Sequence, residues 1–247
     1  MEITEAIIPC AGRGERMGSF TDEIPKPMIT FGGIPFLQFV IYHLNQAGIE
    51  RFIIPVGYKG EKIKDYFGDG SDFGIEIEYV QSSVEAESGG SFMRGLKILK
   101  GDSCLMHYGD AFFPTDLRPA LEDFAKSDKK GMVIASKRYT LEGFADKNNL
   151  EVDKNNNVIA YGEGNPNAKY LDVGLALFRK EVLNDIEGDH FKLASILFPK
   201  LIDENELLVF GTEIKSIGIG NIEKIGRFNN YLKTNNLLEK VKAMKKE

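Results

Sequence analysis

Hydrophobic residues in the first half of the chain fall into short runs that alternate with helical patterns. The runs that predict β-strands are residues 6–9, 52–56, 75–80 and 103–106. All but the third lack the polar-apolar alternation of a half-exposed strand, so we expect those three in the middle of a sheet. Apolar residues recur every three or four positions in residues 36–47 and 117–125, which predicts helices. Such alternation is typical of an α/β fold, a parallel sheet with crossover helices.

The second half has short strands separated by polar turns. The predicted strands are residues 132–135, 150–152, 158–161 and 171–178. Residues 153–157 predict a hairpin turn. Two helical patterns, at 191–201 and from 222 to the end, frame a last predicted strand pair at 207–210 and 214–217. No repeat, linker or compositional break interrupts residues 1–247, so we predict one compact domain.

Composition and charge exclude several classes of protein. With 43% hydrophobic and 28% charged residues, the 247-residue chain can bury a sizeable core. A net charge of −6 argues against general nucleic-acid binding, so any phosphate site must be local. The sequence shows no basic signal-peptide start and no membrane-spanning run. Cys10 and Cys104 lie in apolar runs without metal-ligand spacing, which favours buried thiols and a cytoplasmic protein.

A glycine-rich loop follows the first predicted strand. Gly12 and Gly14 would let backbone N–H groups approach an anion, and polyphosphate is the natural ligand. A dinucleotide fingerprint would need glycine where Met17 stands, and the Gly-Lys-Ser/Thr of a Walker loop is absent.

Two cations beside this loop make the signal more specific. Arg16 is followed by Lys26, which lies between two prolines, and together they could neutralise a triphosphate and its departing pyrophosphate. The alternative is a solvated surface loop with a salt-bridged arginine. The segment 11–26 therefore predicts a triphosphate site.

These motifs carry a resemblance to a known family. Ala-Gly-Arg-Gly-Glu-Arg-Met at residues 11–17, followed by Pro-Lys-Pro-Met at 25–28, resembles the signature loop of the sugar-1-phosphate nucleotidylyltransferases, also called pyrophosphorylases. Residues 31–37, 57–67 and 108–110 fall where that family has equivalents, and the chain looks most like its glucose-1-phosphate cytidylyl and heptose-1-phosphate guanylyl branches. The resemblance implies one domain with a twisted, mostly parallel sheet flanked by helices. It also implies a nucleotide-binding half at residues 1–115, and an acceptor-binding half with the C-terminal helices at 116–247.

The resemblance also implies site residues. Arg16, Lys26 and Asp110 would be catalytic. Asp110 follows a predicted strand, where open α/β sheets bind ligands, and one carboxylate with phosphate oxygens can recruit Mg²⁺. The alternative for Asp110 is a helix cap. The implied nucleotide-binding residues are Ala11, Gly12, Arg13, Gly14, Gln81, Ser88, Gly89 and Gly109. The implied acceptor-binding residues are Glu163, Val173 and Gly174.

Two of the departures from the family concern the acceptor and the metal. Gly164 stands where relatives have a lysine that grips the acceptor's phosphate, so Lys169, Arg138 or Lys147 would have to replace it, or the acceptor is unusual. Gly218 stands where relatives have the second metal-binding Asp, which leaves Asp110 as the metal's protein anchor.

The sequence thus predicts a Mg²⁺-dependent enzyme that joins a nucleoside triphosphate to a sugar phosphate or another small phosphorylated acceptor. CTP or GTP is favoured and UTP is allowed. We expect an acceptor other than a standard hexose 1-phosphate, no nucleic-acid or membrane partner, and leave open a homo-oligomer. The competing hypothesis is a nucleotide sensor that has lost turnover. The histidines, at positions 43, 107 and 190, show no metal-ligand spacing and are expected to be structural or surface residues.

Overall fold

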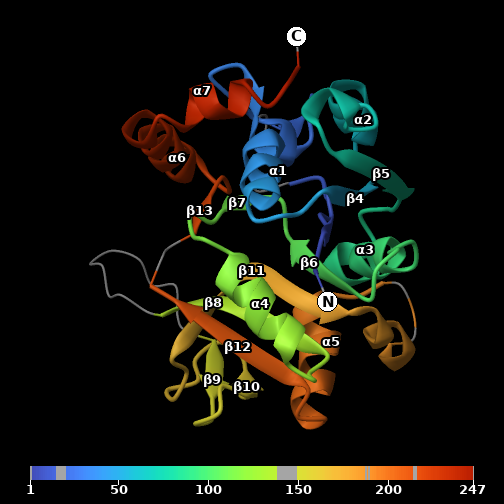
Figure 1. The fold of residues 1–247 in the computed structure, drawn as a ribbon, viewed down its shortest axis with the longest axis vertical. Coiled ribbons are helices and arrows are strands. Elements are labelled where there is room, and N and C mark those ends of the chain that lie inside the picture. Colours follow the sequence, from blue (N-terminus) through green and yellow to red (C-terminus); the bar gives the residue numbers. More distant parts are fainter. Residues whose placement is uncertain are drawn as a thin grey trace.

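A computed structural model describes residues 2–14, 21–137, 149–186, 188, 190–213 and 216–246. Its centre is a nine-stranded sheet, in which the order β10-β9-β11-β6-β1-β4-β5 forms one path and β8 and β12 branch from β11 (Figure 1). These strands are β1 (Glu5–Ile7), β4 (Arg51–Val56), β5 (Glu76–Gln81), β6 (Ser103–His107), β8 (Gly131–Lys137), β9 (Leu150–Val152), β10 (Val158–Tyr161), β11 (Tyr170–Arg179) and β12 (Leu207–Thr212).

The strands of the first half run parallel. β1 lies between β4 and β6, and β5 pairs with β4, all in parallel. β11 is antiparallel to both β6 and β8, and β12 is parallel to β8. The three predicted central strands correspond to β1, β4 and β6, which are interior, so that prediction and the α/β fold are confirmed.

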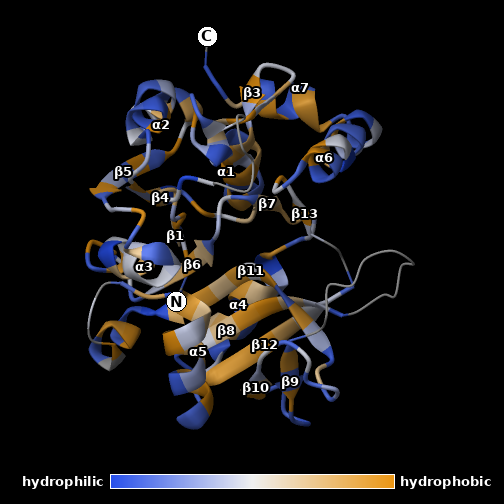
Figure 2. Ribbon diagram, turned by 180° about the vertical axis from the view of Figure 1, so that it is seen from behind, coloured by the Kyte–Doolittle hydropathy of each residue, from blue (hydrophilic) through white to orange (hydrophobic). Residues whose placement is uncertain are grey.

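Helices cover both faces of the sheet. Alternate residues of β1 belong to two different hydrophobic clusters: Ala6 lies with residues of α1, α4 and α6, and Ile7 with residues of α3 and α5. Because both faces are covered, the middle residues of the central strands are apolar, and polar residues such as Glu5, Arg51 and His107 stand at strand ends. Figure 2 shows β8, β11 and β12 mostly in orange, and helices with both blue and orange residues. The helices are α1 (Phe36–Gln46), α2 (Gly60–Phe67), α3 (Glu87–Leu96), α4 (Arg118–Lys126), α5 (Leu193–Asp203), α6 (Ile222–Asn235) and α7 (Leu237–Lys242).

The C-terminal helices pack against the first half of the chain (Figure 1). The Phe228 ring of α6 lies 4.8 Å from the ring of Phe31 and 4.9 Å from that of Phe36, at the start of α1. The amide of Gln38 donates a 2.8 Å hydrogen bond to the carbonyl of Val241 in α7. The end of the chain therefore closes over α1. Within the described ranges, no helix has the length and apolar character that crossing a membrane requires.

One predicted pairing is wrong. The segments 207–210 and 214–217 do not pair with each other, because β12 takes the free edge of β8, whereas β13 (Ile217–Gly218) pairs with β7 (Ala111–Phe112). Residues 214 and 215 lie outside the described ranges. The predicted last helix is also two helices, since Asn236 takes a left-handed conformation (φ 49°) between α6 and α7. Apolar periodicity identifies strands but not their partners. A minor hairpin, β2 (Thr30–Phe31) with β3 (Ile34–Pro35), precedes α1.

Candidate active site

The structure brings Lys26 and Asp110 together at the carboxyl ends of β1 and β6. The Lys26 ammonium lies 2.6 Å from the Asp110 carboxylate, although 84 residues separate them along the chain. The Lys26 side chain is 11% exposed and that of Asp110 is 40% exposed. The lysine is thus held in the protein, while the carboxylate remains accessible to a ligand.

Local backbone geometry explains how each residue reaches this place. Lys26 begins a short 3₁₀ turn, Lys26–Met28, because Pro25 and Pro27 restrict the chain around it. Asp110 follows Gly109, whose φ of 71° turns the chain at the end of β6. After Asp110 the chain enters β7, and α4 starts only at Arg118, so the helix-cap alternative for Asp110 is wrong.

The described part of the phosphate loop, residues 11–14, lies against Lys26. Gly14 has a φ of 70°, and a side chain there would meet Cβ of Lys26 at 3.1 Å, so glycine permits the close approach. Gly12 faces open space, and Arg13 is exposed with its guanidinium 5.5 Å from the centre of the Tyr58 ring. Arg16, predicted to be catalytic, lies outside the described residues.

Tyr58 ties the two ends of this loop, a role that sequence reasoning missed. Its backbone N–H donates to the carbonyl of Ala11 (3.1 Å). Its hydroxyl contacts the carbonyls of Thr21 (3.1 Å) and Asp22 (3.3 Å), beyond residues 15–20. The preceding Gly57 allows this contact, because a Cβ there would lie 2.9 Å from the carbonyl oxygen of Ala11. The Gly-Tyr pair directly after a buried strand was the available sequence signal.

The β13–α6 turn closes the other side of the Lys26–Asp110 pair. The N–H of Ile219 donates to the carbonyl of Asp110 at 3.0 Å. A Cβ at Gly218 would lie 3.7 Å from that same oxygen, and one at Gly220 would lie 3.6 Å from the Lys26 ammonium. Gly218 is therefore next to Asp110, where a side-chain carboxylate could have joined it in binding a metal.

His107 is buried directly beneath this site. Its Nδ1 accepts a 2.9 Å hydrogen bond from the N–H of Gly109, and burial lowers its pKa to about 4. The imidazole is therefore neutral near pH 7. Burial also lowers the pKa of His43, and raises those of the thiols of Cys10 and Cys104, which are buried as predicted.

Three of the predicted nucleotide-binding residues, Gln81, Ser88 and Gly89, lie at the end of β5 and the start of α3. Gln81 is exposed at the end of β5. The side-chain oxygen of Ser88 accepts a 3.2 Å hydrogen bond from the N–H of Leu193. Gly89 is buried, and a Cβ there would meet the Phe191 ring at 2.3 Å. The segment before α5 thus covers Gly89, while Gln81 stays open.

The predicted acceptor residues surround a bulge in β11. The pairing of β11 with β8 shifts between Asp172 and Leu175, and Gly174 has a φ of 85°. Gly174 lies against Tyr108, because a Cβ there would be 2.6 Å from that ring. The Asp172 carboxylate fixes the bulge by accepting hydrogen bonds from the N–H of Gly174 (2.8 Å) and the hydroxyl of Tyr161 (3.1 Å). Burial raises the pKa of Asp172.

The remaining acceptor candidates are at the surface. Val173 is half-buried in the bulge, and Glu163 is exposed in the turn after β10. Gly164 follows with a φ of 80°, a left-handed conformation that a lysine adopts rarely. Lys169 is exposed, and its backbone N–H donates a hydrogen bond to the carbonyl of Leu150. Arg138 and Lys147 lie outside the described residues.

The donor set suits a metal ion that arrives with its own phosphate ligands. Within the described ranges, no group of three or more His, Cys, Asp or Glu side chains could hold a metal. Asp110 supplies one accessible carboxylate. Mg²⁺ accepts one or two carboxylates together with phosphate oxygens and water, so Asp110 fits as the protein's anchor for a magnesium–triphosphate complex.

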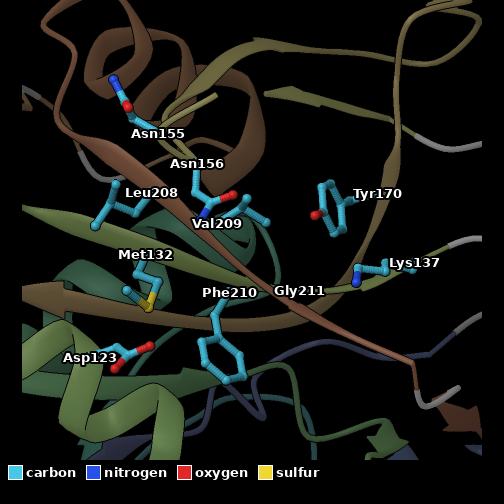
Figure 3. A pocket seen from close by; sticks show the side chains of 10 residues that line it. All are labelled: Asp123, Met132, Lys137, Asn155, Asn156, Tyr170, Leu208, Val209, Phe210 and Gly211. Atoms are coloured by element: carbon cyan, nitrogen blue, oxygen red, sulfur yellow. The ribbon is translucent and has the colours of Figure 1, made fainter. Parts of the chain in front are cut away.

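A separate hollow of about 440 Å³ lies at the outer edge of the sheet (Figure 3). Its lining comes from α4, β8, β11, β12 and the β9–β10 turn, and includes Asp123, Lys137, Asn156 and Tyr170. None of the predicted site residues lines it. The Lys26–Asp110 site is thus distinct from this hollow.

Comparison with known proteins shows the family of this chain. The family model described as "Nucleotidyl transferase" matches residues 5–195. D-glycero-alpha-D-manno-heptose 1-phosphate guanylyltransferase of Campylobacter jejuni is 33% identical over 182 residues, covering 73% of this chain and 78% of that protein. Mannose-1-phosphate guanylyltransferase of Mycobacterium tuberculosis is 28% identical, covering 84% of this chain and 58% of that protein. Similar proteins also include a uridylyltransferase and a cytidylyltransferase.

A solved structure shows the same fold. The inositol-1-phosphate CTP transferase from T. maritima superposes with a TM-score of 0.76 at 24% identity, over 98% of this chain and 97% of that one. Because the family model matches most of its length, this chain belongs to the nucleotidyl transferase family. The resemblance inferred from the loop and the Pro-Lys-Pro motif, and the prediction of a nucleotidyltransferase-type enzyme, are confirmed.

Proposed function

We propose that this protein is a Mg²⁺-dependent nucleotidylyltransferase that condenses a nucleoside triphosphate with a sugar phosphate or another small phosphorylated acceptor, releasing pyrophosphate. The observation that carries the proposal is the Lys26–Asp110 pair beside a glycine-rich loop, at the carboxyl ends of parallel strands. Ligands bind at this edge in open α/β sheets. CTP or GTP is the favoured substrate, and UTP is allowed.

In the proposed reaction, a phosphate oxygen of the acceptor attacks the α-phosphorus of the triphosphate. A new phosphorus–oxygen bond forms as the bond between the α-phosphorus and its bridging oxygen breaks, and the electron pair leaves with pyrophosphate. No covalent protein intermediate is needed. The protein contributes by holding two anionic groups in line and neutralising the charge that develops.

Each part of the site has a task in this scheme. Gly12 and Gly14 keep the loop backbone open to the triphosphate, and Lys26, held at one place by its prolines, neutralises phosphate charge. Asp110 would anchor Mg²⁺, which supplies Lewis-acid charge neutralisation when bound. The β11 bulge at Val173 and Gly174 would form a wall for the acceptor.

The test is a matrix of the common nucleoside triphosphates against sugar and non-sugar phosphates, scored by pyrophosphate release with and without Mg²⁺. We expect release with one or a few pairs, and its loss in Asp110→Asn. Asp123→Asn, on the exposed face of α4, is a matched control that should keep full activity. No release with any pair would overturn the proposal. Efficient turnover of glucose or mannose 1-phosphate would overturn only the expectation of an unusual acceptor.

One observation favours a second candidate, a nucleotide sensor without turnover. Gly218 offers no carboxylate beside Asp110, and Lys26 already neutralises the Asp110 charge. Calorimetry separates the candidates. Tight triphosphate binding without pyrophosphate release across the matrix would favour the sensor.

A further inference from the structure

A second lysine, Lys224, enters the site from helix α6. It lies in the first turn of this helix, where its backbone N–H donates a 2.8 Å hydrogen bond to the side chain of the N-cap residue Asn221. Its side chain runs beside Gly218, since a Cβ at Gly218 would lie 3.6 Å from Cδ of Lys224. The same point is 3.7 Å from the carbonyl oxygen of Asp110. The arm of Lys224 therefore occupies space next to Asp110 that a larger residue at position 218 would share.

Among the described residues of this cluster, positive and negative charges do not balance. Lys26 and Lys224 bring two positive charges, and Asp110 brings one negative charge that is paired with Lys26. Within the described part of the chain, the Lys224 side chain takes part in no ion pair or hydrogen bond, although it is half-buried. Exposed lysines commonly lack partners, but a half-buried lysine whose side chain runs beside Gly218, next to Asp110, is available for an anion.

The position of Lys224 indicates which anion it binds. Lys26 is on the side of the phosphate loop, since a Cβ at Gly14 would lie 3.1 Å from Cβ of Lys26. Lys224 comes from the opposite element, the turn and helix that follow β13, and reaches the site past Gly218. Two phosphates that must meet at Asp110 repel each other, and a cation on each side reduces that repulsion.

We propose that Lys224 binds the phosphate of the acceptor, a phosphate monoester dianion. The proposal rests on the proposed function, and it answers the question that Gly164 raises, namely which cation holds the acceptor's phosphate. Of the three lysine and arginine candidates from the sequence, only Lys169 lies in the described ranges, and its backbone N–H bonds to the carbonyl of Leu150. Lys224, on helix α6, supplies a positive charge for the acceptor's phosphate.

The principal test uses Lys224→Met, which keeps most of the aliphatic arm over Gly218 and removes the charge. In the pyrophosphate assay, we expect the KM for the acceptor to rise roughly tenfold to hundredfold, the effect of losing a charge-assisted hydrogen bond, while the KM for the triphosphate changes little. Lys224→Arg should recover most of the acceptor affinity. Lys233→Met, an exposed lysine on the same helix, is the matched control and should behave like the wild type.

A binding measurement keeps this inference separate from the proposed function. Inorganic phosphate is titrated calorimetrically into the wild type and the variants, with saturating pyrophosphate present to fill the triphosphate loop. Phosphate binding that weakens at least tenfold in Lys224→Met, and not in Lys233→Met, supports the proposal even if no acceptor turns over.

Three outcomes would overturn it. The first is equal phosphate binding by wild type and Lys224→Met, and the second is no phosphate binding by the wild type at millimolar concentration. The third is a rise in the KM for the triphosphate instead of the acceptor, which would assign Lys224 to the nucleotide side. Far-UV circular dichroism and thermal unfolding confirm that each variant is folded.

Discussion

The charged side chains at the two ends of the parallel strands differ in how they are paired. At the amino ends, the buried Arg51 guanidinium contacts three carboxylates, those of Glu5, Glu76 and Glu78, on β1 and β5. Glu5 also accepts a 3.2 Å hydrogen bond from the N–H of Lys100. At the carboxyl ends, the Asp110 carboxylate pairs with Lys26, and the side chain of Lys224 runs beside Gly218.

This difference separates a structural cluster from a binding cluster. A buried charge is tolerated when it is paired and hydrogen-bonded, and Arg51 is satisfied within the protein. Lys224 and the accessible side of Asp110 have no such partners among the described residues. The amino-terminal cluster should therefore control stability, and the carboxyl-terminal cluster should control ligand binding and turnover.

The largest expected effect comes from breaking the amino-terminal cluster. Arg51→Met leaves the buried Glu5 without its cation, so we expect a loss of about 3–5 kcal/mol in the free energy of unfolding. Urea denaturation measures it, and kcat of the folded enzyme should stay unchanged. Lys100→Met, which removes an exposed partner of Glu76, should cost less than about 1 kcal/mol. Equal losses from the two variants would show that burial does not distinguish these charges.

Removing the cation at the opposite end should act on turnover instead. In Lys26→Met, kcat for pyrophosphate release should fall about 100- to 1,000-fold, the usual effect of losing one group that stabilises developing charge. Lys100→Met again serves as the control and should keep full activity. If Lys26→Met had a normal kcat and a lowered melting temperature, Lys26 would contribute to stability and not to turnover.

The buried His107, beneath the active site, should make the free energy of unfolding depend on pH. Burial lowers its folded pKa from 6.5 to about 4, so the unfolded chain binds the proton more readily between these values. Its contribution is fully present above pH 6.5 and is lost as the pH falls toward 4, by up to about 3 kcal/mol. Between pH 4 and 7, the free energy of unfolding should change less with pH in His107→Asn than in the wild type. Parallel profiles for variant and wild type would contradict the assignment.

The smallest expected effect concerns the tie between the ends of the phosphate loop. Tyr58→Phe removes the hydroxyl contacts to Thr21 and Asp22, which should cost about 1 kcal/mol of stability. Because this tie holds the triphosphate loop, the KM for the triphosphate should rise a few-fold while the KM for the acceptor stays constant. Tyr79→Phe removes a similar hydroxyl contact, to the carbonyl of Gly68, away from the loop. If both variants change the KM for the triphosphate equally, the Tyr58 hydroxyl contacts do not specifically hold the triphosphate loop.

Much of the fold was predictable because local patterns reflect burial. The uninterrupted apolar runs of β1, β4 and β6 indicated strands covered on both faces, and the apolar spacing of α1 and α4 indicated helices with one buried side. The glycine-rich loop and Pro-Lys-Pro pointed to the family, since these short segments carry their conformation in their own residues. The C-terminal pairing was not predictable, because β12 and β13 could each have paired with several edges.

The sequence by itself determined the strands, the phosphate loop and the family. Glycines, prolines and apolar periodicity act over a few neighbouring residues, and their effects can be inferred locally. Only the tertiary structure decided that Gly218 lies beside Asp110, that Lys224 reaches the same point, and that Arg51 gathers three carboxylates. These contacts join residues far apart in the chain, and their charge balance exists only once the sheet has brought them to the same end.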